Sequence, residues 1–525
     1  MNDTRIRLIR LGFTMLFAVV ALRLFWIQVV QAPGLRAKAQ AQSRMRQLLS
    51  APRGAIVDCD GAVLAADGVS GREWPSGPVA LPILGMVGRD GSGLMGLEYA
   101  FDKDLRSVPG WKVARRTARG GAWPSFEGEG SGPRQGLTVV TTLRLGLQSE
   151  VEKILAEAVK DHDAKGGVAL VMEAATGDVV AAASLPAPAS RADMARGRVD
   201  AGLVHRTYEP GSTFKAITLA SALENQQITL DSRFNVGLSF DPGDGSQHIR
   251  DSHPHPGVFS ALWCFQQSSN VCFSQIALRL GQERLYRTAR DLGFGTPSGL
   301  GLPGEEAGLL RTVDNWTARS LPTLAIGQEV SVTPMQLASA YAALANKGVL
   351  MRPRLVKALV DEHGDTVERM DPRPVRQAVS GKTASQVLRA MAMVVDSGTG
   401  SLATVPGVRI LGKTGTSQKV NVATNKYFQD RFMASFVGII DLDRRPVVCL
   451  VVLDDPTRAG HTGGLAAAPA FARIARFAVD DPTGPWGAGA VDSRGTLQTW
   501  LSRGRKQMTD SVPLAIEKAG SEAPG

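Results

Sequence analysis

Residues 433–454 read MASFVGIIDLDRRPVVCLVVLD, and this stretch decides the fold. Its two largely apolar runs, residues 433–440 and 447–454, are separated by a polar segment that contains two aspartates, two arginines and a proline. Apolar runs of this length, bounded by turn-forming residues, are typical of buried β-strands. The stretch therefore predicts two antiparallel neighbours within a sheet that is covered on its faces.

Three more strands complete the predicted sheet. Residues 167–172 and 179–184 are apolar and are joined by turn residues, which predicts a second hairpin. The fifth strand follows the apolar residues 408–411 and contains Lys413. Apolar residues at helical spacing predict helices at residues 145–162, 212–224, 262–267, 271–280, 282–292 and 334–346. We therefore expect an α/β fold, with a five-stranded antiparallel sheet flanked by helices.

The chain is expected to divide into four parts. Residues 1–32 would form a cytoplasmic tip and a transmembrane anchor, and residues 33–140 a small, loop-rich α+β pedestal module with many glycines and prolines. Residues 141–480 carry the sheet and form the main domain. Residues 481–525 contain glycine and proline and are expected to form a flexible tail.

The membrane anchor is inferred from an N-terminal apolar run. Residues 11–30 read LGFTMLFAVVALRLFWIQVV, which is long enough to span a bilayer as a helix. Arg5, Arg7 and Arg10 precede it, and positive charge beside a span marks the cytoplasmic side. We therefore expect a single-pass protein of the inner (plasma) membrane with its body outside the cytoplasm and residues 35–49 as a helical stalk. A cleaved signal peptide is the alternative, which the length of the run disfavours.

Charge and composition narrow the range of partners. The 525-residue chain carries a net charge of +10, which suits anionic partners such as a membrane surface, a cell-wall polymer or nucleic acid. The sequence contains no zinc-finger spacing, phosphate loop or basic patch interleaved with aromatic residues, so nucleic acid is not an expected partner. No cysteine pair has metal-binding spacing, and we expect neither a metal nor a cofactor.

The four cysteines have different expected roles. Cys449 lies in the apolar run 447–454 and is expected to pack in the core. Cys264 and Cys272 flank Ser268, and outside the cytoplasm they can be joined. Sequence does not show their geometry, so free thiols are the default expectation.

Ser212-Thr213-Phe214-Lys215 is the first of three motifs that carry chemistry. Pro210 and Gly211 form a turn before it, which places Ser212 at the start of a helix. Residues three apart share a helix face, so the amine of Lys215 can reach the Ser212 hydroxyl and take its proton when neutral. The alternative is a capping serine followed by a solvated lysine, but the helix is otherwise apolar.

Ser268-Ser269-Asn270 is the second motif, in a short loop between two predicted helices. The hydroxyl of Ser268 can relay a proton because it both donates and accepts. The amide of Asn270 can bind a peptide group of a substrate. The alternative is an ordinary capping loop.

Lys413-Thr414-Gly415-Thr416 is the third motif, on an expected edge strand. The amine of Lys413 and the hydroxyls of Thr414 and Thr416 can hold a carboxylate, and Gly415 lets a ligand backbone approach. The backbone N–H groups of Ser212 and Thr416 are the expected oxyanion hole. The three motifs together indicate an acyl-serine enzyme that acts on a peptide with a free C-terminus.

These motifs resemble those of the class B penicillin-binding proteins, the membrane-anchored peptidoglycan D,D-transpeptidases. The resemblance covers residues from about 10 to 475, and the strings YEPGSTFK (208–215) and GQEVSVTP (327–334) are most similar to the division-specific, FtsI-like branch. Further strings that resemble the family are residues 53–65, 93–99, 293–295 and 302–305. The stretch between the first two of these is shorter than the family usually has.

The resemblance implies a reaction and a set of roles. Ser212 would attack a D-alanyl-D-alanine stem peptide and form an acyl-enzyme, which an amine of a neighbouring stem would resolve as a crosslink during septal wall synthesis. Lys215 would be the general base, Ser268 the proton relay and Asn270 a substrate-amide binder. The carboxylate site would be Lys413, Thr414, Gly415 and Thr416. β-Lactams would acylate Ser212, and a polytopic glycosyltransferase, other division proteins and the lipid-linked precursor polymer would be partners.

Two other classes of function remain open at this point. A D,D-carboxypeptidase or a serine β-lactamase would hydrolyse the acyl-enzyme and needs a placed water and base, for which the sequence gives no assignable glutamate. A β-lactam sensor or a non-catalytic division scaffold would not need turnover. The short segment before the apolar run is too small for a signalling domain.

Overall fold

The computed structural model describes residues 3–68, 71–116, 122–124, 130–186, 201–243, 245, 247–421, 423–424, 426–442 and 445–481. Backbone contacts divide the chain into two compact units, one of Met1–Pro52 with Ser107–Gly136 and one of Arg53–Arg106 with Leu137–Gly525. The four-part division expected from the sequence remains a prediction. The expected flexible tail, apart from its first residue, lies outside the described residues.

The first unit begins with the apolar run. Helix α1 (Asp3–Phe25) continues through a π-helical turn, η1 (Trp26–Val30), and an 18-residue window within residues 3–30 has a mean hydropathy of 2.1 and no buried residue. Within the described residues this is the one helix long and apolar enough to cross a membrane. A single-pass anchor is consistent with this helix.

The expected helical stalk at residues 35–49 is helical only in its first part. Helix α2 (Ala32–Ser43) gives way to strand β1 (Arg44–Leu49). This strand pairs antiparallel with β7 (Gly110–Arg116), which also pairs with β8 (Ala122–Pro124) and β9 (Gly130–Ser131). The prediction was wrong there because the backbone partner of β1 lies more than sixty residues away, and local propensity does not register it.

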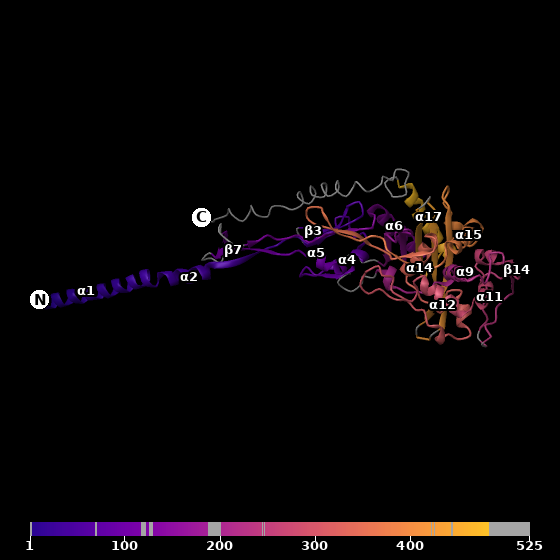
Figure 1. The fold of residues 1–525 in the computed structure, drawn as a ribbon, viewed down its shortest axis with the longest axis horizontal. Helices are drawn as coiled ribbons and strands as arrows, with labels where there is room; N and C mark the ends of the chain where they lie inside the picture. Colours follow the sequence, from indigo (N-terminus) through magenta and orange to yellow (C-terminus); the bar gives the residue numbers. More distant parts are fainter. Residues whose placement is uncertain are drawn as a thin grey trace. The chain divides into compact units, whose positions relative to one another are not determined.

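The second unit contains the predicted five-stranded sheet, which is confirmed (Figure 1). Its strands are all antiparallel to their neighbours and follow the order β12-β11-β21-β20-β19. Their bounds are Gly166–Glu173 for β11, Val179–Leu185 for β12, Ile410–Asn421 for β19, Lys426–Ile440 for β20 and Val447–Asp454 for β21. Strand β19, which carries Lys413, is an edge strand of this sheet.

Alternating side chains of each strand serve two separate cores. On β21, Val448 and Leu450 face one cluster, whereas Cys449 and Val451 face the other. Helices α6 (Leu145–Asp161) and α17 (Ala468–Asp480) cover the Cys449 side, and α9 (Lys215–Glu224) and α14 (Pro334–Ala345) contribute to the core on the opposite side. The expected core position of Cys449 is therefore confirmed.

The predicted helices are present with shifts of at most one residue at their ends, except that the first turn of the helix predicted over residues 212–224 is a 3₁₀ turn and α9 begins at Lys215. The further long helices of this region are α10 (Ala261–Gln266), α11 (Asn270–Leu280), α12 (Gln282–Asp291) and α15 (Gly381–Ser397). The sequence analysis missed α15 and α17. The start of α14 is well encoded, because Thr333 and Gln336 form a reciprocal capping box around Pro334.

A second sheet joins the N-terminal part of this unit to later segments. Its order is β17-β16-β10-β2-β3-β4, with β2 (Ile56–Val57), β3 (Val63–Gly68), β4 (Gly71–Glu73), β10 (Thr138–Thr141), β16 (Val356–Val360) and β17 (Thr366–Arg369). The short elements are α3 (Leu81–Leu84), β5 (Met86–Val87), β6 (Gly93–Met95), α4 (Gly96–Ala100), α5 (Asp102–Leu105), α8 (Gly202–His205), η2 (Gly211–Phe214), β13 (Arg233–Val236), β14 (Gly257–Ser260), η3 (Val313–Asn315), α13 (Ser320–Leu324), β15 (Val349–Met351), β18 (Pro374–Gln377), η4 (Ser401–Ala403) and α16 (Gly463–Ala466).

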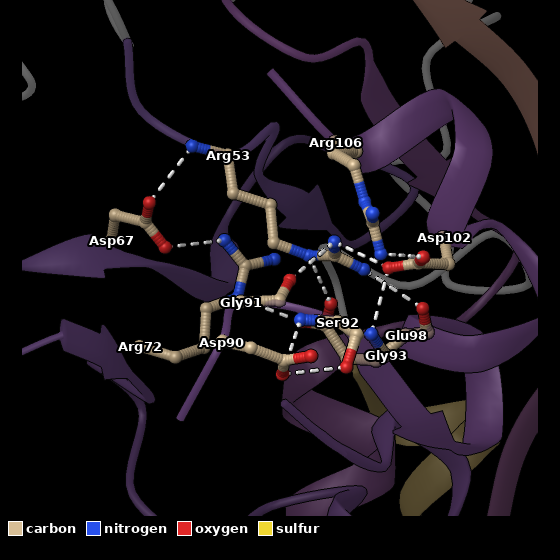
Figure 2. Close-up of polar contacts among 10 residues, drawn as sticks. All are labelled: Arg53, Asp67, Arg72, Asp90, Gly91, Ser92, Gly93, Glu98, Asp102 and Arg106. Carbon is tan, nitrogen blue, oxygen red and sulfur yellow. Dashed lines mark hydrogen bonds and ion pairs between the residues drawn. The ribbon is translucent and has the colours of Figure 1, made fainter. Parts of the chain in front are cut away.

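A buried ion-pair cluster fixes residues 53–106 (Figure 2). Glu98 is fully buried, and its two carboxylate oxygens accept from Arg53 Nε at 2.8 Å and from Arg72 Nε at 2.7 Å. Arg53 also donates to Asp102 at 2.7 Å. Removing one member of such a cluster leaves buried charge without compensation, which is strongly destabilising.

We expect Glu98→Ala to lower the free energy of unfolding by about 3–5 kcal/mol, because two buried guanidinium groups would lose their shared carboxylate. Urea denaturation of the purified chain measures this. The matched control is Arg106→Ala, whose half-exposed side chain pairs with Asp102 and should contribute at most about 1 kcal/mol. Equal, small effects of both substitutions would contradict the structural role of the cluster.

Candidate active site

The turn before Ser212 packs closely against another loop. Gly211 has a φ of +54° and its N–H donates to the carbonyl of Gly327 at 3.0 Å. A Cβ at Gly327 would lie 2.0 Å from the carbonyl oxygen of Gly211, so that position requires glycine. Ser212 is the second residue of the 3₁₀ turn η2, which leads directly into α9. The predicted placement of Ser212 at a helix start is confirmed.

Lys215 lies one turn further along and is fully buried. Its amine is 3.0 Å from the hydroxyl of Ser212 and 3.1 Å from that of Ser268. It also donates to the carbonyl oxygen of Ser268 at 2.6 Å and to Asn270 Oδ1 at 2.7 Å. The structure thus brings together the first and second sequence motifs.

Lys413 reaches the same cluster from β19. Its amine donates to the hydroxyl of Ser268 at 2.9 Å and is fully buried. The Ser268 hydroxyl therefore lies between two lysine amines. An aromatic ring packs beside each amine. The Phe273 ring centroid is 5.7 Å from Lys215 Nζ, and the Phe265 ring centroid is 5.7 Å from Lys413 Nζ.

Burial lowers the pKa of both lysine amines. Desolvation lowers the pKa of Lys215 to about 7, and the negative charge of Asp251 opposes that shift. Burial also lowers the pKa of Lys413 well below its usual value, and the positive charge of Lys215 adds to the effect. Lys215 can therefore lose its proton near neutral pH, as a general base must.

The Ser268 loop is constrained by its surroundings. Ser268 has a φ of +60°, which is unfavourable for serine. Ser269 caps α11, because its hydroxyl accepts from the N–H of Cys272 at 3.1 Å. Cys264 and Cys272 form a disulfide that bridges α10 and α11 on either side of the loop. The default expectation of free thiols was therefore wrong, since folding brings the two buried sulfurs together.

The third motif lies against the turn that carries Ser212. A Cβ at Gly415 would lie 2.8 Å from a methyl of Thr213 and 2.4 Å from the hydroxyl oxygen of Ser435. Gly415 thus permits close packing of β19, and its expected contact with a ligand remains a prediction. The hydroxyl of Thr414 pairs with that of Thr399 at 2.6 Å, and that of Thr416 accepts from the N–H of Gly463 at 3.1 Å.

Sequence reasoning missed two acidic residues near these motifs. Asp251 binds the Ser268 loop, and no local pattern marks it. Glu209 precedes the turn that carries Ser212, accepts from the Tyr427 hydroxyl at 3.0 Å, and has a pKa that burial raises to about 7. Its place inside the YEPGSTFK string was a signal that could have found it.

The rate of acylation by a penicillin should rise with pH through about 7. As the expected base, Lys215 would be inactive while protonated below its pKa and active above it. Stopped-flow acylation rates across the pH range measure this limb. Glu209→Gln is the matched control, because Glu209 also titrates near 7. If that substitution abolished the limb, the assignment to Lys215 would be wrong.

Comparison with known proteins places these features in a family. The family described as "Penicillin binding protein transpeptidase domain" matches residues 167–476. Stage V sporulation protein D of Bacillus subtilis is 34% identical over 426 residues, which cover 80% of this chain and 65% of that protein. The chain therefore spans less than two thirds of the length of this relative.

Two further proteins are similar to this chain over most of its length. The probable peptidoglycan D,D-transpeptidase PenA of Neisseria meningitidis is 31% identical over 431 residues, 80% of this chain and 71% of that protein. The crystal structure of penicillin-binding protein 3 from Mycobacterium tuberculosis superposes with a TM-score of 0.72 at 31% identity, over 82% of this chain and 96% of that one. Other structures of that protein are complexes with aztreonam and ampicillin. The chain therefore belongs to the penicillin-binding proteins that carry a transpeptidase domain, among their FtsI-like class B members.

Proposed function

We propose that this chain is a peptidoglycan D,D-transpeptidase that crosslinks stem peptides through an acyl-enzyme on Ser212. One observation carries the proposal: the amine of Lys215 lies within hydrogen-bond distance of both the Ser212 and the Ser268 hydroxyls, and Lys413 shares Ser268. A nucleophile, a base and a relay are thereby joined in one buried chain of contacts.

In the first half-reaction, neutral Lys215 takes the proton of the Ser212 hydroxyl as its oxygen attacks the carbonyl carbon of the penultimate D-alanine. The N–H groups of Ser212 and Thr416 stabilise the oxyanion, each contributing about 3 kcal/mol in comparable enzymes. The C–N bond to the terminal D-alanine then breaks. Ser268 passes a proton from the lysine pair to the leaving nitrogen.

The second half-reaction reverses this proton path. An amine of a neighbouring stem peptide attacks the acyl carbon and gives up its proton through Ser268 and Lys215. The ester bond breaks, the Ser212 hydroxyl is regenerated, and an amide crosslink remains. Asn270 would bind the peptide backbone of the donor.

The carboxylate of the donor would bind at the third motif. Lys413, Thr414 and Thr416 all lie on strand β19. One strand therefore offers an amine and two hydroxyls to a carboxylate. A bound carboxylate favours the protonated form of Lys413, and the resulting charge keeps Lys215 neutral. A β-lactam presents a carboxylate and an acyl carbon at similar positions, which accounts for covalent inhibition.

The cellular setting is part of the proposal. The apolar helix with three preceding arginines supports a single-pass inner-membrane anchor with the N-terminus in the cytoplasm and the catalytic part outside. The strings YEPGSTFK (208–215) and GQEVSVTP (327–334), which resemble the division-specific branch of the family, support a role at the division septum. Expected partners are the nascent lipid-linked polymer, a polytopic glycosyltransferase and other division proteins.

The test is a crosslinking assay with purified full-length protein in detergent and nascent peptidoglycan polymer. The expected product is a dimeric muropeptide, released after muramidase digestion and measured by mass spectrometry. Release of D-alanine without dimers would indicate a carboxypeptidase, and rapid multiple turnover of a chromogenic cephalosporin would indicate a β-lactamase. Absence of both products and of turnover would indicate a scaffold or a sensor.

A further inference from the structure

The carboxylate of Asp251 accepts hydrogen bonds from the second motif and from the residue that follows it. One oxygen accepts from the N–H groups of Asn270 at 2.5 Å and Val271 at 3.0 Å. The other accepts from the hydroxyl of Ser269 at 2.7 Å. The preceding carbonyl, of Arg250, accepts from the side-chain amide of Asn270 at 2.8 Å. The first turn of α11 is thus held by Arg250 and Asp251, which lie about twenty residues earlier in the chain.

This contact determines where the base lies. Lys215 donates to the carbonyl of Ser268 and to Asn270 Oδ1, so the position of its amine depends on the Ser268–Asn270 loop. Ser268 has a positive φ, which is strained for a non-glycine residue and persists only under external support. Asp251 supplies hydrogen bonds on one side of that loop, and the Cys264–Cys272 disulfide joins its flanks.

The same carboxylate also places a negative charge near the lysine pair. The negative charge of Asp251 raises the pKa of Lys215, against the lowering by burial, and the charge of Lys215 in turn lowers the pKa of its neighbour Lys413. Asp251 favours the ammonium form of Lys215, whereas burial favours the neutral amine. Removal of the Asp251 charge should therefore shift deprotonation of Lys215 to lower pH.

We propose that Asp251 is a positioning residue that fixes the Ser268–Asn270 loop and sets the pH range in which Lys215 acts as a base. The inference rests on the proposed function, because it assigns Lys215 that role. It adds a residue outside the three motifs to the machinery that controls acylation.

The experiment compares pH profiles of acylation by a fluorescent penicillin for the full-length wild type, Asp251→Asn and Asp251→Glu. Asparagine can keep the two backbone bonds and can donate to Ser269, but it carries no charge. We expect its acid limb to move to lower pH by about one unit. Its plateau rate should fall about tenfold, because the loop is held less tightly.

Asp251→Glu separates charge from placement. It restores a carboxylate at a displaced position, so its acid limb should return towards the wild-type pH while its plateau rate stays reduced. The matched control is Asp241→Asn, which removes an equal charge from the same connecting segment, where Asp241 is 61% exposed and caps the N–H of Gly243. This control should reproduce the wild-type profile.

The outcomes are distinct. If the acid limb of the Asp251→Asn pH profile lay at the wild-type pH, the inference would be overturned, whether or not the plateau rate was reduced. Circular dichroism and the unfolding midpoint verify that each variant is folded, and Asp251→Glu provides a second folded test if asparagine is not tolerated. If the wild-type protein itself forms no adduct at Ser212, the proposed function fails, which is a separate result from an unmoved limb.

Discussion

Ser212→Ala is expected to abolish covalent labelling by penicillin. The variant has no oxygen that can form the acyl bond, so no adduct should accumulate at any incubation time. Crosslinking of nascent polymer should be lost with it, by a factor of at least about 10⁴. Fluorescent labelling on a denaturing gel measures the first effect, and the dimeric muropeptide yield measures the second.

Ser221→Ala is the matched control for this variant. Ser221 lies on the same helix α9 and is also buried, but its hydroxyl contacts Thr288 at 2.8 Å and the carbonyl of Arg284, away from the lysine pair. It should label at the wild-type rate. Persistent labelling of Ser212→Ala would show that another nucleophile carries the acyl group.

Lys215→Met is expected to reduce the acylation rate by about 10²–10⁴, the range typical for loss of a general base. Methionine keeps much of the apolar stem of lysine but cannot accept a proton. The remaining slow reaction should also lose the rise in rate near pH 7, because that rise is assigned to Lys215. Single-turnover acylation across the pH range measures both effects.

Lys153→Met controls for the removal of a lysine charge. Its side chain is 60% exposed on α6 and pairs with Glu150, so the acylation rate should not change. Retention of the acid limb in Lys215→Met would contradict the role of this amine. In that case Glu209, whose pKa is also about 7, would become the group to examine.

Much of the sheet, and the placement of Lys215 near Ser212, could be predicted because both depend on short-range sequence patterns. The run 447–454 is a strand with those same bounds, since seven consecutive apolar residues between turn signals leave few alternatives. Lys215 was placed near Ser212 because three residues make almost one helical turn. Helix α15 was missed although its buried residues, among them Val387, Met391 and Val394, recur at helical spacing, because no motif drew attention to it.

Contacts that depend on tertiary packing were beyond local patterns. Ser268 and Lys413 are 145 residues apart, and only their membership in known motifs suggested that they meet. Asp251 belongs to no motif, so neither its bonds to Asn270 nor its effect on Lys215 could be read from the sequence. The Cys264–Cys272 disulfide required the relative placement of two helices.

The most direct test is to map the site of acylation. Trypsin cleavage after Arg206 and Lys215 yields residues 207–215, TYEPGSTFK, in which Ser212 is the one serine. After incubation of the full-length protein with a penicillin, tandem mass spectrometry should find the acyl group on that serine. An adduct on any other residue, or none under conditions that label a known penicillin-binding protein, would contradict the proposed acyl-enzyme.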